Sequence, residues 1–357
     1  MDEQRMIRSL LAQAPPSAEV TAEGRRRVLS QAEPRHTPRK AMFRLSLAAA
    51  GIAAVTAAAL LMSGGSPTTP PTARQVLLTA AEKTASAPVG RFWHTHVING
   101  QAYYVAQGDY VITGARMEID QWIGRTDQDG DAFRSRFAGA YPQTSADQAA
   151  WRRAGSPETW SVLSNGSQIK QTTDAEPWDT RRTTPTQKKQ ASAFFASAAK
   201  RCATKPQTCP RNRPPSPTER EALANDKTAL QQALRKGAGQ GGPESELTGA
   251  AYLLTQPGSP KLAAAIFQAL ADTPGIRNAG TVKDTGGRKA LALAARASDP
   301  HGTFDTELLL DPATYRVLGT QTVLVSGTTP ETRGMKPGTV YTQQLFLEMG
   351  WTNTAPQ

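Results

Sequence analysis

The spacing of apolar residues divides the chain into a polar N-terminal stretch, one uncharged run and a long mixed segment. Residues 45–62 read LSLAAAGIAAVTAAALLM, without a charge or a proline. Eighteen helical residues span about 27 Å, close to the ~30 Å hydrocarbon core of a bilayer. Met42 and Phe43 extend the apolar run. We therefore expect residues 41–62 to form one transmembrane helix in contact with membrane lipids.

Charges on the two sides of this run predict its orientation. Residues 1–44 hold nine Lys and Arg against five acids, whereas no Lys or Arg follows the run until Arg74. Positively charged flanks stay in the cytoplasm. We therefore expect a protein of the cell membrane, with residues 1–40 as a cytoplasmic tail and the bulk of the chain outside the cytoplasm. A cleaved signal peptide and a buried helix of a soluble protein are the alternatives, and a basic region of forty residues disfavours the signal peptide.

Residues 63–74 are predicted to form a linker. After it, apolar residues recur with the period of two that is typical of strands and with the period of 3.6 that is typical of helices. An apolar stripe with helical spacing begins near Gln75, and the helix should end before Pro88. This helix is the first element of a domain that we place at residues 75–350. Alternating apolar residues predict strands at 91–98, 103–112 and 116–124. Asp129-Gly130 and Asn165-Gly166 are typical of hairpin turns. Residues 351–357 form a C-terminal tail.

The middle and the end of the domain differ in pattern. Residues 180–215 are rich in Pro, Thr and Ser and predict an irregular basic insertion. Helices follow at 216–236, 244–255 and 260–272, with Ser216 and Ser259 as N-caps and Glu219 completing a capping box. Strands return at 281–284, 288–297, 303–310, 316–325 and 340–348, separated by short turns, and predict an antiparallel meander.

This order of elements predicts the fold class. Strands, then helices, then strands, joined by hairpins, are typical of an α+β protein. We expect one transmembrane helix followed by an extracytoplasmic curved antiparallel sheet, built from both halves of the domain and covered by helices on one face.

The net charge of +11 is concentrated in the middle of the chain. The basic insertion carries nine cations and no acid: Arg181, Arg182, Lys188, Lys189, Lys200, Arg201, Lys205, Arg211 and Arg213. This composition is compatible with a solvated loop. The alternative is a polybasic arm that contacts anionic lipid headgroups or cell-wall polymers. Nucleic acid is excluded as a partner by the expected compartment.

Cys202 and Cys209 are the only cysteines. Outside the cytoplasm an even pair predicts a disulfide, which we expect between these two residues. A zinc site would need further His or Cys ligands close by in the sequence, and none is present.

No motif in the sequence predicts catalysis, a cofactor or a metal. His94 and His96 share one face of a strand, but no third ligand at a suitable spacing completes a metal site. The stretch 127–131 (DQDGD) departs from a calcium loop, and residues 237–242 (GAGQGG) follow a helix where a dinucleotide motif would follow a strand. A hairpin turn and a linker explain the two stretches, and scattered carboxylates such as Glu118 and Asp120 form no evident acid–base pair.

Several stretches resemble a known family. They are 262–284 (LAAAIFQALADTPGIRNAGTVKD), Gly287-Arg288, 308–314 (LLLDPAT) and Leu318-Gly319, together with Pro15-Pro16, 26–29 and 74–78. The chain resembles a family of uncharacterised actinobacterial single-pass membrane proteins often encoded beside extracytoplasmic-function sigma factors. Its domain is more distantly similar to the half-barrels of periplasmic lipoprotein carriers and of an envelope-stress regulator that binds an anti-sigma factor.

The resemblance and the topology together imply a non-catalytic, membrane-anchored envelope protein with a sensory or regulatory role in a sigma-factor circuit. The N-terminal tail would then meet a cytoplasmic regulatory partner. The alternative is an envelope carrier or scaffold that binds a lipid or another apolar ligand in the sheet concavity. An enzyme of unrecognised type is a third hypothesis.

Overall fold

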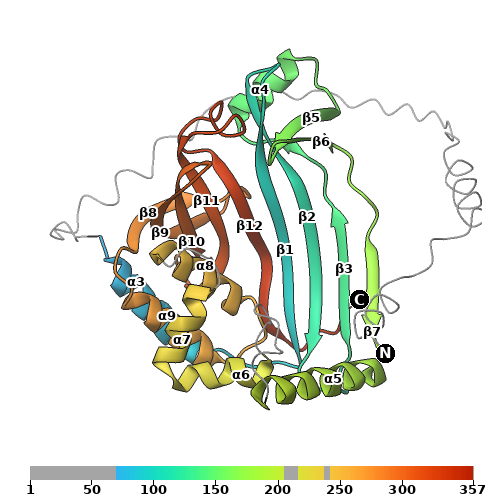
Figure 1. Ribbon diagram of the computed structural model, residues 1–357, viewed down its shortest axis with the longest axis vertical. Helices are drawn as coiled ribbons and strands as arrows, with labels where there is room; N and C mark the ends of the chain where they lie inside the picture. Colours follow the sequence, from blue (N-terminus) through green and yellow to red (C-terminus); the bar gives the residue numbers. More distant parts are fainter. Residues whose placement is uncertain (1–69, 205–215, 237–241, 357) are drawn as a thin grey trace, which may run out of the picture. The chain divides into compact units, whose positions relative to one another are not determined.

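The computed structural model describes residues 70–204, 216–236 and 242–356, which belong to one unit, Thr68–Gln357 (Figure 1). The predicted cytoplasmic tail, the predicted transmembrane helix and residues 63–69 of the predicted linker lie outside these residues. Within the described ranges no helix is long and apolar enough to cross a bilayer.

The described part of the chain is an α+β fold with a large antiparallel sheet and seven α-helices. The first half contributes helix α3 (Ala73–Ala85), strands β1 (Phe92–Val105), β2 (Tyr110–Gly124), β3 (Asp131–Phe137) and β4 (Tyr141–Pro142), helix α4 (Ser145–Arg153), strands β5 (Thr159–Ser164), β6 (Ser167–Thr172) and β7 (Asp179–Thr183), and helix α5 (Pro185–Thr204). The second half contributes α6 (Pro217–Ala222), the 3-10 turn η2 (Leu223–Asn225), α7 (Lys227–Lys236), α8 (Pro243–Leu254), α9 (Pro260–Ala271) and strands β8 (Arg277–Lys283), β9 (Lys289–Asp299), β10 (Gly302–Leu310), β11 (Val317–Gly327) and β12 (Val340–Thr352).

The main sheet joins the two halves of the domain. Its order is β7-β3-β2-β1-β12-β11-β10-β9-β8, with β4 beside β2, so the pairing of β1 with β12 links the meander of β8 to β12 to the first strands. The predicted sheet built from both halves is therefore confirmed. Strands β8 to β11 are turned away from the plane of β1 to β3 in Figure 1, and register shifts in several strand pairs accompany the bend.

The core lies between one face of this sheet and helices α3, α7, α8 and α9. Phe267 and Leu270 of α9 are fully buried against Leu293 and Leu308 of the sheet. Ser216 and Ser259 are the N-caps that the sequence predicts, for α6 and α9, and Thr72 caps α3 in the same way. Each of these side chains accepts a hydrogen bond from the third backbone N–H of its helix. The prediction of helices on one face is confirmed for this part of the sheet.

Three predicted elements need correction. The strands expected at 91–98 and 103–112 have other bounds. Strand β1 continues through Gly100, which is absorbed into a β-bulge, as far as Val105, and a turn at residues 106–109 interrupts the second expected strand before β2 begins at Tyr110. The helix expected at 216–236 breaks before α7, since the Asp226 carboxylate accepts a hydrogen bond from the backbone N–H of Ala229 and starts a new helix.

The third correction concerns the basic insertion. Residues 179–204 form β7 and α5, so the prediction of an irregular stretch is wrong for this portion. Thr184 and Gln187 exchange capping hydrogen bonds at the start of α5, and a run rich in alanine continues the helix.

Candidate functional site

An apolar cavity of about 250 Å³ lies between the helices and the sheet near the start of β1 and the end of β12. Its walls come from α3, α8, α9, the turn between β10 and β11, and both central strands. Most of the wall is hydrocarbon or indole, chiefly Trp93, Leu262, Ala263, Ile266, Phe267 and Trp351. We refer to it as the tryptophan cavity. A dry apolar space larger than ~150 Å³ is known to accept small hydrocarbons, so this volume suits an apolar group.

Two tryptophans on neighbouring strands shape the cavity. Trp93 of β1 and Trp351 of β12 occupy paired positions in the register, and their rings meet edge to face with centroids 5.5 Å apart. The indole N–H of Trp93 donates to the carbonyl oxygen of Thr255, and that of Trp351 donates to Gly258, each at 2.9 Å. Both polar atoms are thus bonded to the connection between α8 and α9, which leaves ring carbon to line the space.

The charged side chains that line the cavity are both cations. Lys83 at the end of α3 and Arg316 in the turn between β10 and β11 line it, and both residues are exposed. Among the described residues that line the cavity there is no Asp or Glu, although Asp311 lies near Arg316 in the same turn and Glu221 accepts a hydrogen bond from the backbone N–H of Ser259. An apolar interior with two cations on its solvent side is suited to a molecule with a hydrocarbon part and an anionic head.

A second cavity of similar volume lies beside α8 and is chemically different. Its walls include the hydroxyl and amide side chains of Thr306, Thr320, Thr322 and Gln344. Glu307 also lines it, and burial raises the pKa of this carboxyl although Gln321 donates a hydrogen bond to it. This polar space is less suited to an apolar ligand than the tryptophan cavity.

The two histidines considered above are part of a charged ladder on the sheet face opposite the helices. His94 Nε2 lies 2.7 Å from Asp120, and His96 Nε2 lies 2.8 Å from Glu118. Arg134 and Arg136 of β3 bond the remaining oxygens of these two carboxylates.

The ladder is closed by aromatic rings. His94 stacks on Trp122 with ring centroids 4.1 Å apart, and both guanidinium groups lie over the ring of Trp178. Burial would raise the pKa of Glu118, but hydrogen bonds from His96 and Arg136 outweigh this effect and lower it. Cross-strand spacing could have suggested these pairs once the register was known.

The ladder satisfies its own charges. Each carboxylate has an imidazole and a guanidinium partner, and in the described part of the chain no group of three or more His, Cys, Asp or Glu is placed to hold a metal ion. We assign this ladder a structural role, because its two carboxylates are each paired with an imidazole and a guanidinium group and its second His94 nitrogen lies 3.1 Å from Glu348.

The predicted basic residues separate into three groups. Arg181 and Arg182 lie on β7, while Lys188, Lys189, Lys200 and Arg201 lie on α5. Lys205, Arg211 and Arg213 lie outside the described residues. Arg181 forms an ion pair with Asp179 at 2.7 Å.

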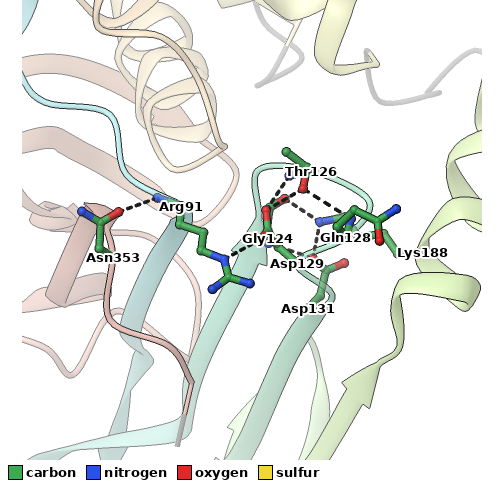
Figure 2. Close-up of polar contacts among 8 residues, drawn as sticks. All are labelled: Arg91, Gly124, Thr126, Gln128, Asp129, Asp131, Lys188 and Asn353. Atoms are coloured by element: carbon green, nitrogen blue, oxygen red, sulfur yellow. Dashed lines mark hydrogen bonds and ion pairs between the residues drawn. The ribbon is translucent and has the colours of Figure 1, made fainter.

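Lys188 fixes α5 to the turn between β2 and β3 (Figure 2). Its ammonium group donates to the Gly124 carbonyl oxygen at 2.5 Å and to Asp131 at 2.7 Å, and its side chain is only 12% exposed. The same turn is held from the other side by Arg91, which lies 2.5 Å from Asp129. Hydrogen bonds from Arg91 and then Thr126 lower the pKa of Asp129 to about 2. The sequence stretch 127–131 is thus the hairpin turn that was predicted.

Of the two cysteines in the predicted disulfide, only Cys202 lies within the described residues. Cys202 near the end of α5 is disulfide-bonded. Cys209 lies outside the described residues, so its pairing with Cys202 stays a prediction.

Comparison of the chain with protein-family models, with curated proteins and with solved structures finds no match. The family resemblance and the sigma-factor link therefore remain predictions.

Proposed function

We propose that this chain is a non-catalytic, membrane-anchored envelope protein whose domain binds an anionic amphiphile with one acyl chain. The acyl chain occupies the tryptophan cavity, and the head group lies near Lys83 and Arg316. The observation that carries the proposal is an apolar wall whose charged lining side chains, Lys83 and Arg316, are both cations.

The chemistry of the wall supports binding rather than catalysis. Both indole N–H groups are already hydrogen-bonded, so the interior offers ring carbon and aliphatic carbon to a ligand. General acid–base or nucleophilic catalysis needs a convergent set of polar groups within reach of the substrate. The two charged side chains at the cavity, Lys83 and Arg316, are exposed, so they are available to a head group.

The head-group part of the proposal is tested by reversing charge. The fragment 68–357 contains every core residue described above, so it is the material of choice for ligand titrations. In the variant Lys83→Glu/Arg316→Glu, a long-chain carboxylate should bind about tenfold more weakly, because two partly screened attractions become repulsions. The corresponding uncharged alcohol should bind equally well to both proteins.

A matched control separates a local effect from net charge. Lys283 and Lys289 are exposed and face each other across the β8–β9 hairpin, away from the cavity lining. Lys283→Glu/Lys289→Glu changes the net charge by the same amount and should leave carboxylate affinity unchanged. Equal carboxylate affinity of the cavity variant and the wild type would refute the head-group assignment.

A regulatory role is the second candidate, and the resemblance to proteins encoded beside sigma factors favours it. In that case ligand occupancy outside the membrane would be reported through the tail of residues 1–40. Affinity purification with residues 1–44 tests this role, which would be rejected if no cytoplasmic partner is recovered.

A further inference from the structure

Helix α5 is long, yet its described residues contribute no buried side chain to the core. It spans twenty residues, and none of its described side chains is buried. Two contacts in its first half hold it to the domain. Lys188 donates to the turn between β2 and β3 (Figure 2), and the hydroxyl of Ser192 donates to Asp127 at 2.9 Å. The second half of the helix extends past these anchors.

An apolar stripe runs along this exposed part of α5. Ala191, Phe194, Phe195 and Ala198 follow the spacing that brings side chains onto one side of a helix. Phe194 and Phe195 are each 62% exposed, and their rings contact each other edge to face at 5.7 Å. They are the most exposed large apolar side chains in the described part of the chain. Leaving both rings in water is unfavourable, so the stripe is suited to an apolar partner.

The charge of α5 limits what that partner can be. The helix has no acidic residue, and in the described part of the chain no carboxylate pairs with Lys189, Lys200 or Arg201. Lys189 and Lys200 project from the side opposite the phenylalanine stripe, and Arg201 flanks it. Basic residues on the polar side of a helix with aromatic residues on the other are the pattern of a helix that lies in the interface of an anionic membrane.

The predicted membrane span places such a surface within reach. Ten residues separate the end of the predicted span at Met62 from α3, which begins at Ala73. Even fully extended, ten residues cover no more than about 36 Å. The domain is thereby held close to the bilayer, whereas a free wall polymer would supply negative charge without an apolar phase for the rings.

We propose that α5 is an interfacial helix that binds the anionic surface of the membrane in which the chain is anchored. Phe194 and Phe195 insert among the acyl chains, and Lys189, Lys200 and Arg201 contact lipid phosphates. This inference rests on the predicted membrane span and is independent of the ligand of the tryptophan cavity.

Hydrogen–deuterium exchange of the full-length chain in lipid nanodiscs tests the proposal. Discs of phosphatidylcholine alone are compared with discs that contain phosphatidylglycerol. Amides of residues 190–201 should exchange at least about tenfold more slowly in the anionic discs, since each cation near an anionic surface strengthens binding about fivefold.

Two variants separate the contributions of charge and insertion. Lys189→Gln/Lys200→Gln/Arg201→Gln should remove the difference between the two disc types, and Phe194→Ser/Phe195→Ser should restore fast exchange in both. Arg152→Gln/Arg153→Gln removes an exposed basic pair from α4 and should change nothing in α5. Unfolding curves of all variants should coincide with that of the wild type, because the changed residues are exposed.

Three results would overturn the proposal. They are equal exchange of α5 in both disc types, protection that persists in the phenylalanine variant, and protection by soluble anionic wall polymer where the discs give none. The last result would identify a polymer as the partner. Ligand titrations with the fragment 68–357 contain no bilayer, so their outcome is separate from this test.

Discussion

The volume of the tryptophan cavity predicts how affinity depends on ligand length. A methylene group takes about as much space as a water molecule in the liquid, ~30 Å³, so a cavity of about 250 Å³ holds about eight methylenes. Each methylene moved from water into hydrocarbon contributes ~0.8 kcal/mol, or about fourfold in affinity. A carboxylate with about four more methylenes should therefore bind roughly two hundredfold more tightly while space remains.

Calorimetric titration of the fragment 68–357 with straight-chain carboxylates measures this dependence. Affinity should rise steadily from about six carbons and level off near about ten, where the cavity is full and further methylenes stay in water. Ligands are kept below their micelle concentrations so that the free concentration is defined. An affinity that does not change with chain length would refute the assignment of the cavity to an acyl chain.

A cavity-filling substitution provides the structural test. Ala263 of α9 is half-buried and lines the tryptophan cavity, so Ala263→Phe places a ring where the acyl chain would lie. Binding of the ten-carbon ligand should fall by at least about tenfold, equivalent to about two lost methylene sites.

Ala265 is the matched control on the same helix. It is equally half-buried but does not line the tryptophan cavity. Ala265→Phe should leave affinity unchanged, although either substitution can cost ~1–3 kcal/mol of stability by overpacking. Undiminished binding by Ala263→Phe would show that the ligand lies elsewhere.

Two further predictions concern stability. The folded-state pKa of Asp129, about 2, lies below its ordinary value of 3.8, so its ion pair stabilises the fold above pH 4 and this contribution is lost as pH falls toward 2. Because Arg91 is largely exposed, Asp129→Asn should lower the free energy of unfolding at pH 7 by only about 1 kcal/mol, and urea titrations should show no difference near pH 2. Gly249→Ala should cost ~1–3 kcal/mol, because a Cβ there would collide with the Leu234 carbonyl oxygen of α7, whereas Thr248→Ala at the neighbouring exposed position should change stability by less than ~0.5 kcal/mol.

Elements with a local chemical signal could be predicted from the sequence. Ser259 followed by Pro260 marks the start of α9 within the hydrogen-bonding pattern of its own backbone. Asn165 and Gly166 both adopt positive φ, 48° and 74°, which is the conformation that a tight turn between β5 and β6 requires. Such signals depend on neighbouring residues alone, so no knowledge of the fold is needed.

The start of α5 carries a local signal of the same kind, although the sequence prediction was wrong there. Thr184-Pro185 with Gln187 repeats the capping pattern that was recognised at Ser216-Pro217 with Glu219. The signal was present, but the surrounding Pro, Thr and Lys residues suggested an irregular segment. Local capping chemistry was here the better guide than average composition.

The cavity could not be predicted in this way. Its lining runs from Lys83 to Trp351, and the two tryptophans meet only because β1 pairs with β12 at the centre of the sheet. Nothing in the sequence near Trp93 specifies that pairing or the carbonyl groups that accept its N–H. The charged ladder could not be predicted for the same reason. Glu118 and Asp120 reach His96 and His94 only through the register of β1 with β2.

The two proposals together place ligand entry at the membrane surface. Lys188 of α5 bonds Gly124, and Gly124 pairs with Phe92, the residue that precedes Trp93 in the cavity wall. The interfacial helix and the cavity thus adjoin the same end of β1 and β2. If α5 lies among lipid head groups, a single acyl chain can move between the bilayer and the cavity with little exposure to water. Each methylene that stays out of water during the transfer avoids a free-energy cost of ~0.8 kcal/mol. Transfer of a long-chain ligand from anionic vesicles should therefore slow in Phe194→Ser/Phe195→Ser, while its equilibrium affinity for the fragment 68–357 should not change.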